Sequence, residues 1–178
     1  PNSYLSHFIV QFTYYMCNHF TRHEDYKYYM ANARKADSLW WAIETDAQSF
    51  EWGLGAGSTC NLGYHADAID NNPDSMVSPH IIGGFLPIYE EGKNDLIELY
   101  EHGKSVYEYQ YTDTVLWRYS IADSSYQVSD IAGVDYSTML FGLATLTLLP
   151  KKSTLKMRGA RLKRERKAGS LKINLMHF

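Results

Sequence analysis

The stretch YLSHFIVQFTYYMCNHF, residues 4–20, is the part of the sequence that decides the predicted fold. Its apolar side chains recur every three or four residues, at Leu5, Phe8, Ile9, Phe12, Tyr15 and Met16. This spacing places them on one face of a helix and does not match the alternation of a strand. A second stripe of this kind runs over residues 23–43, and Thr21, three residues before Glu24, forms a capping-box pattern in front of it. Two long helices joined by a short turn predict an αα-hairpin.

The rest of the chain predicts further helices separated by loops. Residues 46–79 are rich in Gly, Asn and Asp, which disfavour regular structure, and we interpret this long loop as functional because it carries aromatic and acidic side chains. Gly103 is predicted as a left-handed helix cap. The expected elements are helices at residues 78–85, 90–102 and 135–149, a strand or helical turn at 106–117, and a loop at 118–132. This order predicts an all-α fold of stacked αα-hairpins with the loops gathered at one end.

Charge divides the 178-residue chain into two parts, an acidic body at residues 1–150 and a basic tail at residues 151–178. Ten of the 17 Lys and Arg residues lie between Lys151 and Lys172, together with one of the 20 acidic residues, so the body carries a net charge of −12. An acidic body does not attract a phosphate backbone, and we expect no nucleic-acid partner. The tail is expected to be solvated and disordered, with a patch for nucleic acid or an anionic membrane, or an out-of-frame end, as the alternatives.

Several classes of function lack their signature in this sequence. The spacing of the His and Cys residues predicts no metal site, and we expect no cofactor. The glycine-rich run of residues 53–57 lacks the Lys-Ser/Thr that ends a phosphate loop. No apolar run reaches 18 residues, so no membrane span is expected. Whether Cys17 and Cys60 pair cannot be decided from their positions.

Carboxylates remain as candidates, and with aromatic rings beside them they suit glycoside hydrolysis, which needs two acids across a sugar. Fifteen tyrosines and four tryptophans supply flat faces that suit sugar or interface binding as well as core packing. Composition does not choose between the acids of the loops. The candidates in loops or at loop edges are Asp67, Asp70, Asp74, Asp113, Asp130 and Asp135.

Motifs in the same order along residues 4–148 resemble the glycoamylase-like family of bacterial glycoside hydrolases. Three segments are similar, in this order, to the family's W-G-L-x-A, G-Y and D-G-T-[IV]-x-P elements: Trp52-Gly53-Leu54-Gly55-Ala56, Gly63-Tyr64 and Asp74-Ser75-Met76-Val77-Ser78-Pro79. Three further segments are similar, in this order, to the family's S-H-x-W-I-D-F, Y-G-F-x-D and G-I-D elements: Ser6-His7-Phe8-Ile9-Val10-Gln11-Phe12, Tyr109-Gln110-Tyr111-Thr112-Asp113 and Gly133-Val134-Asp135. The family includes endo-β-1,2-glucanases and the glucanase-like regions of cyclic glucan synthases.

This resemblance implies part of an (α/α)6 barrel that acts on an oligo- or polysaccharide of the β-glucan class, in the periplasm or outside the cell. The implied catalytic acids of an inverting hydrolysis are Asp113 and Asp135. The candidate substrate-binding residues are His7, Gln11, Trp52, Tyr64, Asp67 and Asp74. Oligomeric state stays undecided.

The departures from the family pattern indicate a partial and divergent copy. Gln11 stands where the pattern has an acid and cannot titrate, Thr13 replaces an arginine, and Ala144-Thr145 replaces Glu-Asn. A non-catalytic saccharide-binding or interaction module is therefore the alternative, and a helical scaffold without a ligand is a third possibility.

Overall fold

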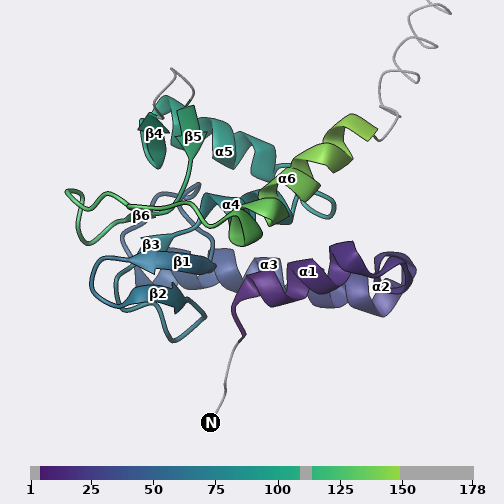
Figure 1. Cartoon of the computed structure of the whole chain (residues 1–178). Helices are drawn as coiled ribbons and strands as arrows, with labels where there is room; N and C mark the ends of the chain where they lie inside the picture. The colour runs from purple at the N-terminus through teal and green to yellow at the C-terminus, as the bar shows by residue number, and fades with distance from the viewer. Residues whose placement is uncertain (1–4, 109–113, 149–178) are drawn as a thin grey trace, which may run out of the picture. The chain divides into compact units, whose positions relative to one another are not determined.

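A computed structural model describes residues 5–108 and 114–148, and it contains helices connected by small antiparallel sheets (Figure 1). Contacts divide the chain into two units, Pro1–Leu146 and Thr147–Phe178. The described elements lie in the first unit, apart from the last two residues of helix α6. The helices are α1 (His7–Met16), α2 (Asn18–Arg22), α3 (Glu24–Glu44), α4 (Pro79–Gly84), α5 (Gly92–Glu101) and α6 (Gly133–Leu148). The strands are β1 (Ala56–Thr59), β2 (Gly63–Ala66), β3 (Met76–Val77), β4 (Val106–Glu108), β5 (Thr114–Leu116) and β6 (Tyr119–Ser120).

The predicted N-terminal αα-hairpin is present, with α1 running alongside α3 (Figure 1). The first helix is shorter than predicted because Cys17 adopts an extended conformation, with φ −125° and ψ 108°, and separates α1 from α2. The predicted capping box is wrong. Thr21 lies inside α2 and its hydroxyl donates to the carbonyl of Tyr14 at 2.7 Å, while His23 occupies the N-cap of α3 without a side-chain hydrogen bond.

The prediction of an all-α fold is wrong for the segments between the helices. Strands β1 and β2 form an antiparallel hairpin inside the predicted loop 46–79, with Gly57 opposite His65 and Ser58 opposite Tyr64. Strand β3 pairs with β6, and β4 pairs with β5, so the open choice between strand and helical turn is resolved as strand at residues 106–108 and 114–116. These strands are two to four residues long, too short for a period-2 pattern to be visible in the sequence.

The later helices agree with the prediction within a few residues. Gly103 follows α5 with φ +65°, which is the predicted left-handed cap. Helix α6 begins at Gly133, two residues before Asp135. Cys17 and Cys60 are both free. In the part of the chain that the structure describes, no helix is long and apolar enough to span a membrane.

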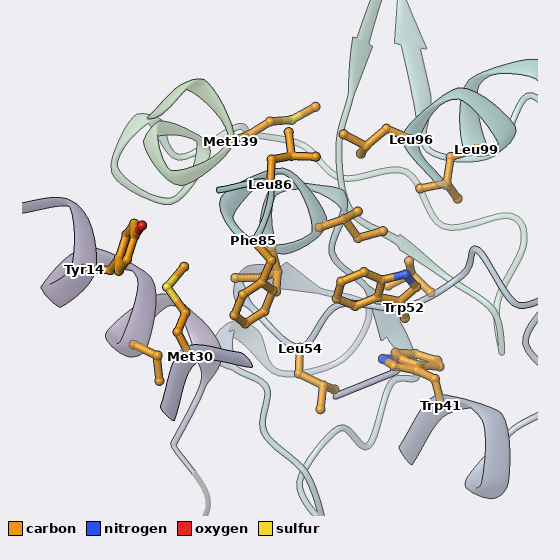
Figure 2. Close-up of a cluster of buried hydrophobic side chains, with 14 of the residues drawn as sticks. Tyr14, Met30, Trp41, Trp52, Leu54, Phe85, Leu86, Leu96, Leu99 and Met139 are labelled. Atoms are coloured by element: carbon orange, nitrogen blue, oxygen red, sulfur yellow. The ribbon is translucent and has the colours of Figure 1, made fainter. Parts of the chain in front are cut away.

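Helix α4 is the centre of the hydrophobic core, and every one of its residues is buried. Figure 2 shows Phe85 and Trp52 at this centre, with Tyr14 and Met30 on one side and Leu96 and Leu99 on the other. The rings of Trp52 and Phe85 stack with centroids 6.2 Å apart. Fully burying a side chain of this size contributes about 1.5–3 kcal/mol, so the hairpin α1/α3, the segment 52–57 and α5 are held together through α4.

Candidate functional site

Tyr64 and Asp135 form the contact around which the candidate site is built. The Tyr64 hydroxyl, on strand β2, donates a hydrogen bond of 2.9 Å to Asp135 Oδ2, in the first turn of α6. Tyr64 is 59% exposed and Asp135 only 1% exposed. The structure therefore brings together two of the predicted site residues from positions 71 residues apart, one with an accessible ring and one with a buried carboxyl group.

Burial determines the protonation of this pair. It raises the pKa of Asp135 above its ordinary value, although the Tyr64 hydroxyl and the charge of Arg118 act to lower it. Burial and the neighbouring carboxylate also raise the pKa of Tyr64 to about 12, so its hydroxyl remains a donor at neutral pH. A carboxyl group with a raised pKa is the kind of group that serves as a general acid in glycoside hydrolysis.

Arg118 and Asp67 are buried and form a polar cluster with the partly exposed His65, and the charge of Arg118 acts to lower the pKa of Asp135. The Arg118 side chain is fully buried, and its Nη2 donates a hydrogen bond to Asp67 Oδ2. Its Nη1 donates to the carbonyl of Gly55 at 3.3 Å. Asp67 Oδ1 lies 2.7 Å from His65 Nδ1. Both oxygens of Asp67 are thus occupied by protein partners and the residue is buried, and its contact with the substrate stays a prediction.

Two glycines of the run at residues 53–57 make room for this cluster. A Cβ on Gly57, which has φ +147°, would lie 2.7 Å from Arg118 Cδ. A Cβ on Gly55 would lie 2.5 Å from His80 Nε2. Both separations are shorter than side chains tolerate, so these glycines allow β1 to approach Arg118 and His80 closely.

His80 and Trp117 stack on each other, with ring centroids 4.7 Å apart. His80 is completely buried, and burial keeps its pKa well below 6.5, so the imidazole is neutral. Neither of its ring nitrogens has a hydrogen-bond partner among the described residues. Trp117 also contacts the ring of Tyr136, 5.8 Å away, and the Thr138 hydroxyl donates to the carbonyl of His80. These contacts attach the first turns of α6 to α4.

His7 belongs to a different buried pair and supports the backbone of the central segment. Its Nδ1 lies 2.6 Å from Asp37 Oδ2, on helix α3. The same carboxylate accepts hydrogen bonds from the backbone N–H groups of Gly53 and Leu54, at 3.0 and 2.9 Å. His7 is itself buried and orients the acid that anchors the segment after Trp52, and its role in substrate binding stays a prediction.

Two further predicted substrate-binding residues lie in the protein core. Gln11 is 0% exposed, and its amide donates to the carbonyl of Ile81 at 2.8 Å. Trp52 is 2% exposed and donates through Nε1 to Asp95 at 2.9 Å, while its ring packs on Phe85. Both side chains make their hydrogen bonds within the protein, and a sugar contact for them stays a prediction.

The hydrogen-bond partners of Asp74 are different from Tyr64 and Asp135. Asp74 accepts hydrogen bonds from the backbone N–H and the side-chain amide of Asn61, at 2.9 and 2.7 Å, and thereby holds the turn between β1 and β2. Burial acts to raise the pKa of Asp74, but these bonds outweigh it and the pKa is lowered. Asp113 lies outside the described residues.

A cavity of about 570 Å³ lies next to strand β4 and the segment that follows β6. Tyr107, Tyr119 and Tyr126 are among its lining residues, and Tyr64 and Asp135 are not. Within residues 5–108 and 114–148, no group of His, Cys, Asp and Glu side chains could hold a metal ion. The described residues at the candidate site offer a carboxyl group, a phenol and a buried guanidinium.

Comparison with known proteins gives one solved structure with a similar fold. No protein-family model matches this chain, and no curated protein matches it. The crystal structure of a putative glucoamylase from Bacteroides uniformis ATCC 8492 is similar, with a TM-score of 0.65 and 14% sequence identity. The match covers 81% of this chain and 36% of that chain, so the present chain spans about a third of the neighbour's length. The chain has a glucoamylase-like helical fold, which confirms the prediction from the sequence motifs at the level of the fold.

Sequence reasoning missed Arg118, His65 and Asp37, which hold the site and its surroundings together. Arg118 stands in the sequence between two aromatic residues, Trp117 and Tyr119, where a charged side chain is unexpected in an apolar segment. Asp37 has a comparable signal, because it falls on the buried face of α3 with Met30 and Trp41. A charged residue inside an apolar pattern is buried only if it is paired, and that rule could have selected both.

Proposed function

We propose that this chain is a carbohydrate-processing domain related to the glycoside hydrolases, and that it contacts a β-glucan through the surface around Tyr64 and Asp135. The observation that carries this proposal is the hydrogen bond from the exposed phenol of Tyr64 to the buried carboxyl group of Asp135. The similarity of the fold to a putative glucoamylase supports it. In this proposal the helices are part of an (α/α)6 barrel, and the protein acts in the periplasm or outside the cell.

The two side chains offer the contacts that a saccharide needs. The exposed ring of Tyr64 can pack against the C–H face of a pyranose, and the carboxyl group of Asp135 can exchange hydrogen bonds with a hydroxyl group. Because burial raises its pKa, Asp135 holds a proton more readily than an exposed aspartate. In an inverting hydrolysis it would donate that proton to the glycosidic oxygen, while a second carboxylate activates water on the opposite face of the sugar.

A non-catalytic saccharide-binding or interaction module is the second candidate, and one observation favours it. Gln11 occupies the position where the family pattern has an acid, and it is buried with its amide bonded to the carbonyl of Ile81. An amide can neither deliver nor accept the proton that hydrolysis requires. Asp113 remains the proposed second acid for catalysis.

Two measurements separate these functions. The chain is incubated with β-1,2-, β-1,3- and β-1,4-linked glucans and new reducing ends are measured, and the corresponding oligosaccharides are titrated by calorimetry. Calorimetry is preferable to tryptophan fluorescence because Trp41, Trp52 and Trp117 are buried. Cleavage supports the hydrolase and binding without cleavage supports the module.

A matched pair of variants tests whether the proposed surface is the one used. Tyr64→Ala removes the ring at the site, and Tyr28→Ala removes a ring that is 69% exposed on α3. We expect Tyr64→Ala to abolish binding and Tyr28→Ala to leave it unchanged. Absence of both binding and cleavage in the unmodified chain would reject the proposed function.

A further inference from the structure

Arg118 carries a charge in a place where charges are costly. Its side chain is 0% exposed, as is that of Asp67, its partner in the ion pair. Removing two charges from water costs several kcal/mol for each ion, and apolar side chains of similar volume often stabilise a fold equally well. Stability alone is therefore a weak reason for an arginine at this position.

Three contacts fix the Arg118 guanidinium. Nη2 bonds to Asp67, Nη1 bonds to the carbonyl of Gly55, and strand β1 approaches the side chain at Gly57, where a Cβ would lie 2.9 Å from Nη1. Asp67 is held in turn by His65 and by its own backbone N–H, which donates to the carbonyl of Gly55. The guanidinium consequently has little freedom to turn.

The fixed charge packs against the hairpin that carries Tyr64: strand β1 meets the Arg118 side chain at Gly57, and the next residue of β1, Ser58, lies opposite Tyr64. The charge acts on Tyr64 and Asp135 through space and opposes the effect of burial on each of them. The packing agrees with this proximity, since Trp117, the residue before Arg118, contacts Tyr136, the residue after Asp135. Arg118 Nε is buried and has no hydrogen-bond partner among the described residues, so the ion pair with Asp67 does not use the whole guanidinium.

We propose that Arg118 is a positioning residue, clamped by Asp67 and the Gly55 carbonyl, which holds its charge beside Asp135 and keeps the Asp135–Tyr64 pair aligned for a saccharide. Both hydrogen bonds of the guanidinium are made within the protein, so Arg118 acts on the site through Asp135. The inference rests on the proposed function for the identity of the ligand. Its electrostatic part concerns Arg118 and Asp135 alone and is tested without a ligand.

Two variants are expected to shift the titration of Asp135 in opposite directions. The double variant Asp67→Leu/Arg118→Met removes both charges together, which avoids leaving one buried ion unpaired. Because a cation lowers the pKa of a neighbouring acid, Asp135 should titrate at higher pH in this variant. Asp67→Asn has nearly the same shape as the native residue and leaves the Arg118 charge uncompensated, so Asp135 should titrate at lower pH.

The measurement is the carbon-13 NMR shift of the Asp135 carboxyl group as a function of pH, assigned with Asp135→Asn. The control is Glu24→Gln/Lys27→Met, which removes an ion pair of 2.6 Å on the surface of α3 and should leave the titration unchanged. Oligosaccharide affinity, measured by calorimetry, should fall roughly tenfold or more in the Asp67→Leu/Arg118→Met variant, since small misplacements of site groups have effects of this size.

Each outcome has a defined meaning. Opposite shifts in the two variants support the proposal, and an Asp135 titration that is the same in wild type, Asp67→Asn and a folded double variant overturns it. If the double variant does not fold, Asp67→Asn alone decides, because an Arg118 charge that does not reach Asp135 would leave the Asp135 titration where it is. If the wild-type chain binds no oligosaccharide, the proposed function fails, whereas the NMR shifts still decide whether Arg118 controls Asp135.

Discussion

The carboxylate of Asp37 joins three segments of the chain: it lies 2.6 Å from the His7 imidazole and accepts the backbone N–H groups of Gly53 and Leu54. Helix α3, the start of α1 and the segment before β1 thus meet at one buried acid. The hairpin β1–β2, which carries Tyr64, follows directly from this junction. The position of the candidate site therefore depends on a residue that is not part of it.

Asp37→Ala should destabilise the fold by about 3–5 kcal/mol, because it leaves a histidine and two backbone N–H groups buried without their acceptor. Urea unfolding followed by circular dichroism measures the change. Asp25→Ala is the matched control, since the Asp25 side chain is 91% exposed near the start of the same helix. Equal stability of the two variants would contradict the anchoring role of Asp37.

Gly57→Ala should destabilise the protein by about 1–3 kcal/mol, because the new Cβ would sit in a backbone conformation that L-residues rarely adopt and would press on Arg118 Cδ. Thermal unfolding measures the loss. A Cβ added at Gly133 meets no atom within 4 Å, so Gly133→Ala is the control and should leave the melting temperature nearly unchanged. A Gly57→Ala protein as stable as the control would show that β1 and Arg118 are not closely packed.

Asp135→Asn should make the protein more stable at neutral pH while removing any hydrolysis. The folded state raises the pKa of Asp135 above its ordinary value of 3.8, so the folded protein holds this proton more tightly than the unfolded chain does. The contribution of Asp135 to stability is therefore full below pH 3.8 and is lost as the pH rises through the folded-state pKa. Unfolding free energies of wild type and variant should converge in acid and separate toward pH 7. A variant less stable than wild type at pH 7 would contradict this assignment.

His80 should give the opposite dependence on pH. Burial, reinforced by the nearby charge of Arg118, holds the pKa of His80 well below 6.5, so the unfolded chain takes up a proton that the folded protein does not. Its contribution to stability is present above pH 6.5 and is lost as the pH falls below that value. His80→Asn should flatten the acid side of the stability profile. His102→Asn, at an exposed position after α5, is the control and should retain the wild-type profile on that side.

Tyr64→Phe tests the hydrogen bond at the site without removing the ring. The phenol O–H stabilises the ionised carboxylate, so its removal should raise the pKa of Asp135 further. Carbon-13 NMR of the Asp135 carboxyl group measures the change, with Tyr28→Phe as the control. An Asp135 titration that moves to lower pH would show that the phenol does not donate to this acid.

The sequence by itself determined the helices. The apolar stripes at residues 4–20 and 23–43, the cap at Gly103 and the helix near Asp135 are visible because helix periodicity depends on residues three or four positions apart. The motif order likewise predicted a glucoamylase-like fold. Helix periodicity and caps are local signals, and the order of the motifs is visible along the chain without the tertiary structure.

Only the tertiary structure decided which predicted residues meet. It joined Tyr64 to Asp135 across 71 positions and Arg118 to Asp67 across 51, and it placed Trp52 and Gln11 in the core. A tryptophan in a loop and a tryptophan in a core have the same local sequence signal, because burial depends on what packs against the ring. In this chain Phe85 and Tyr89, in the segment that follows α4, supply that packing, and no pattern around Trp52 shows that they will lie against it.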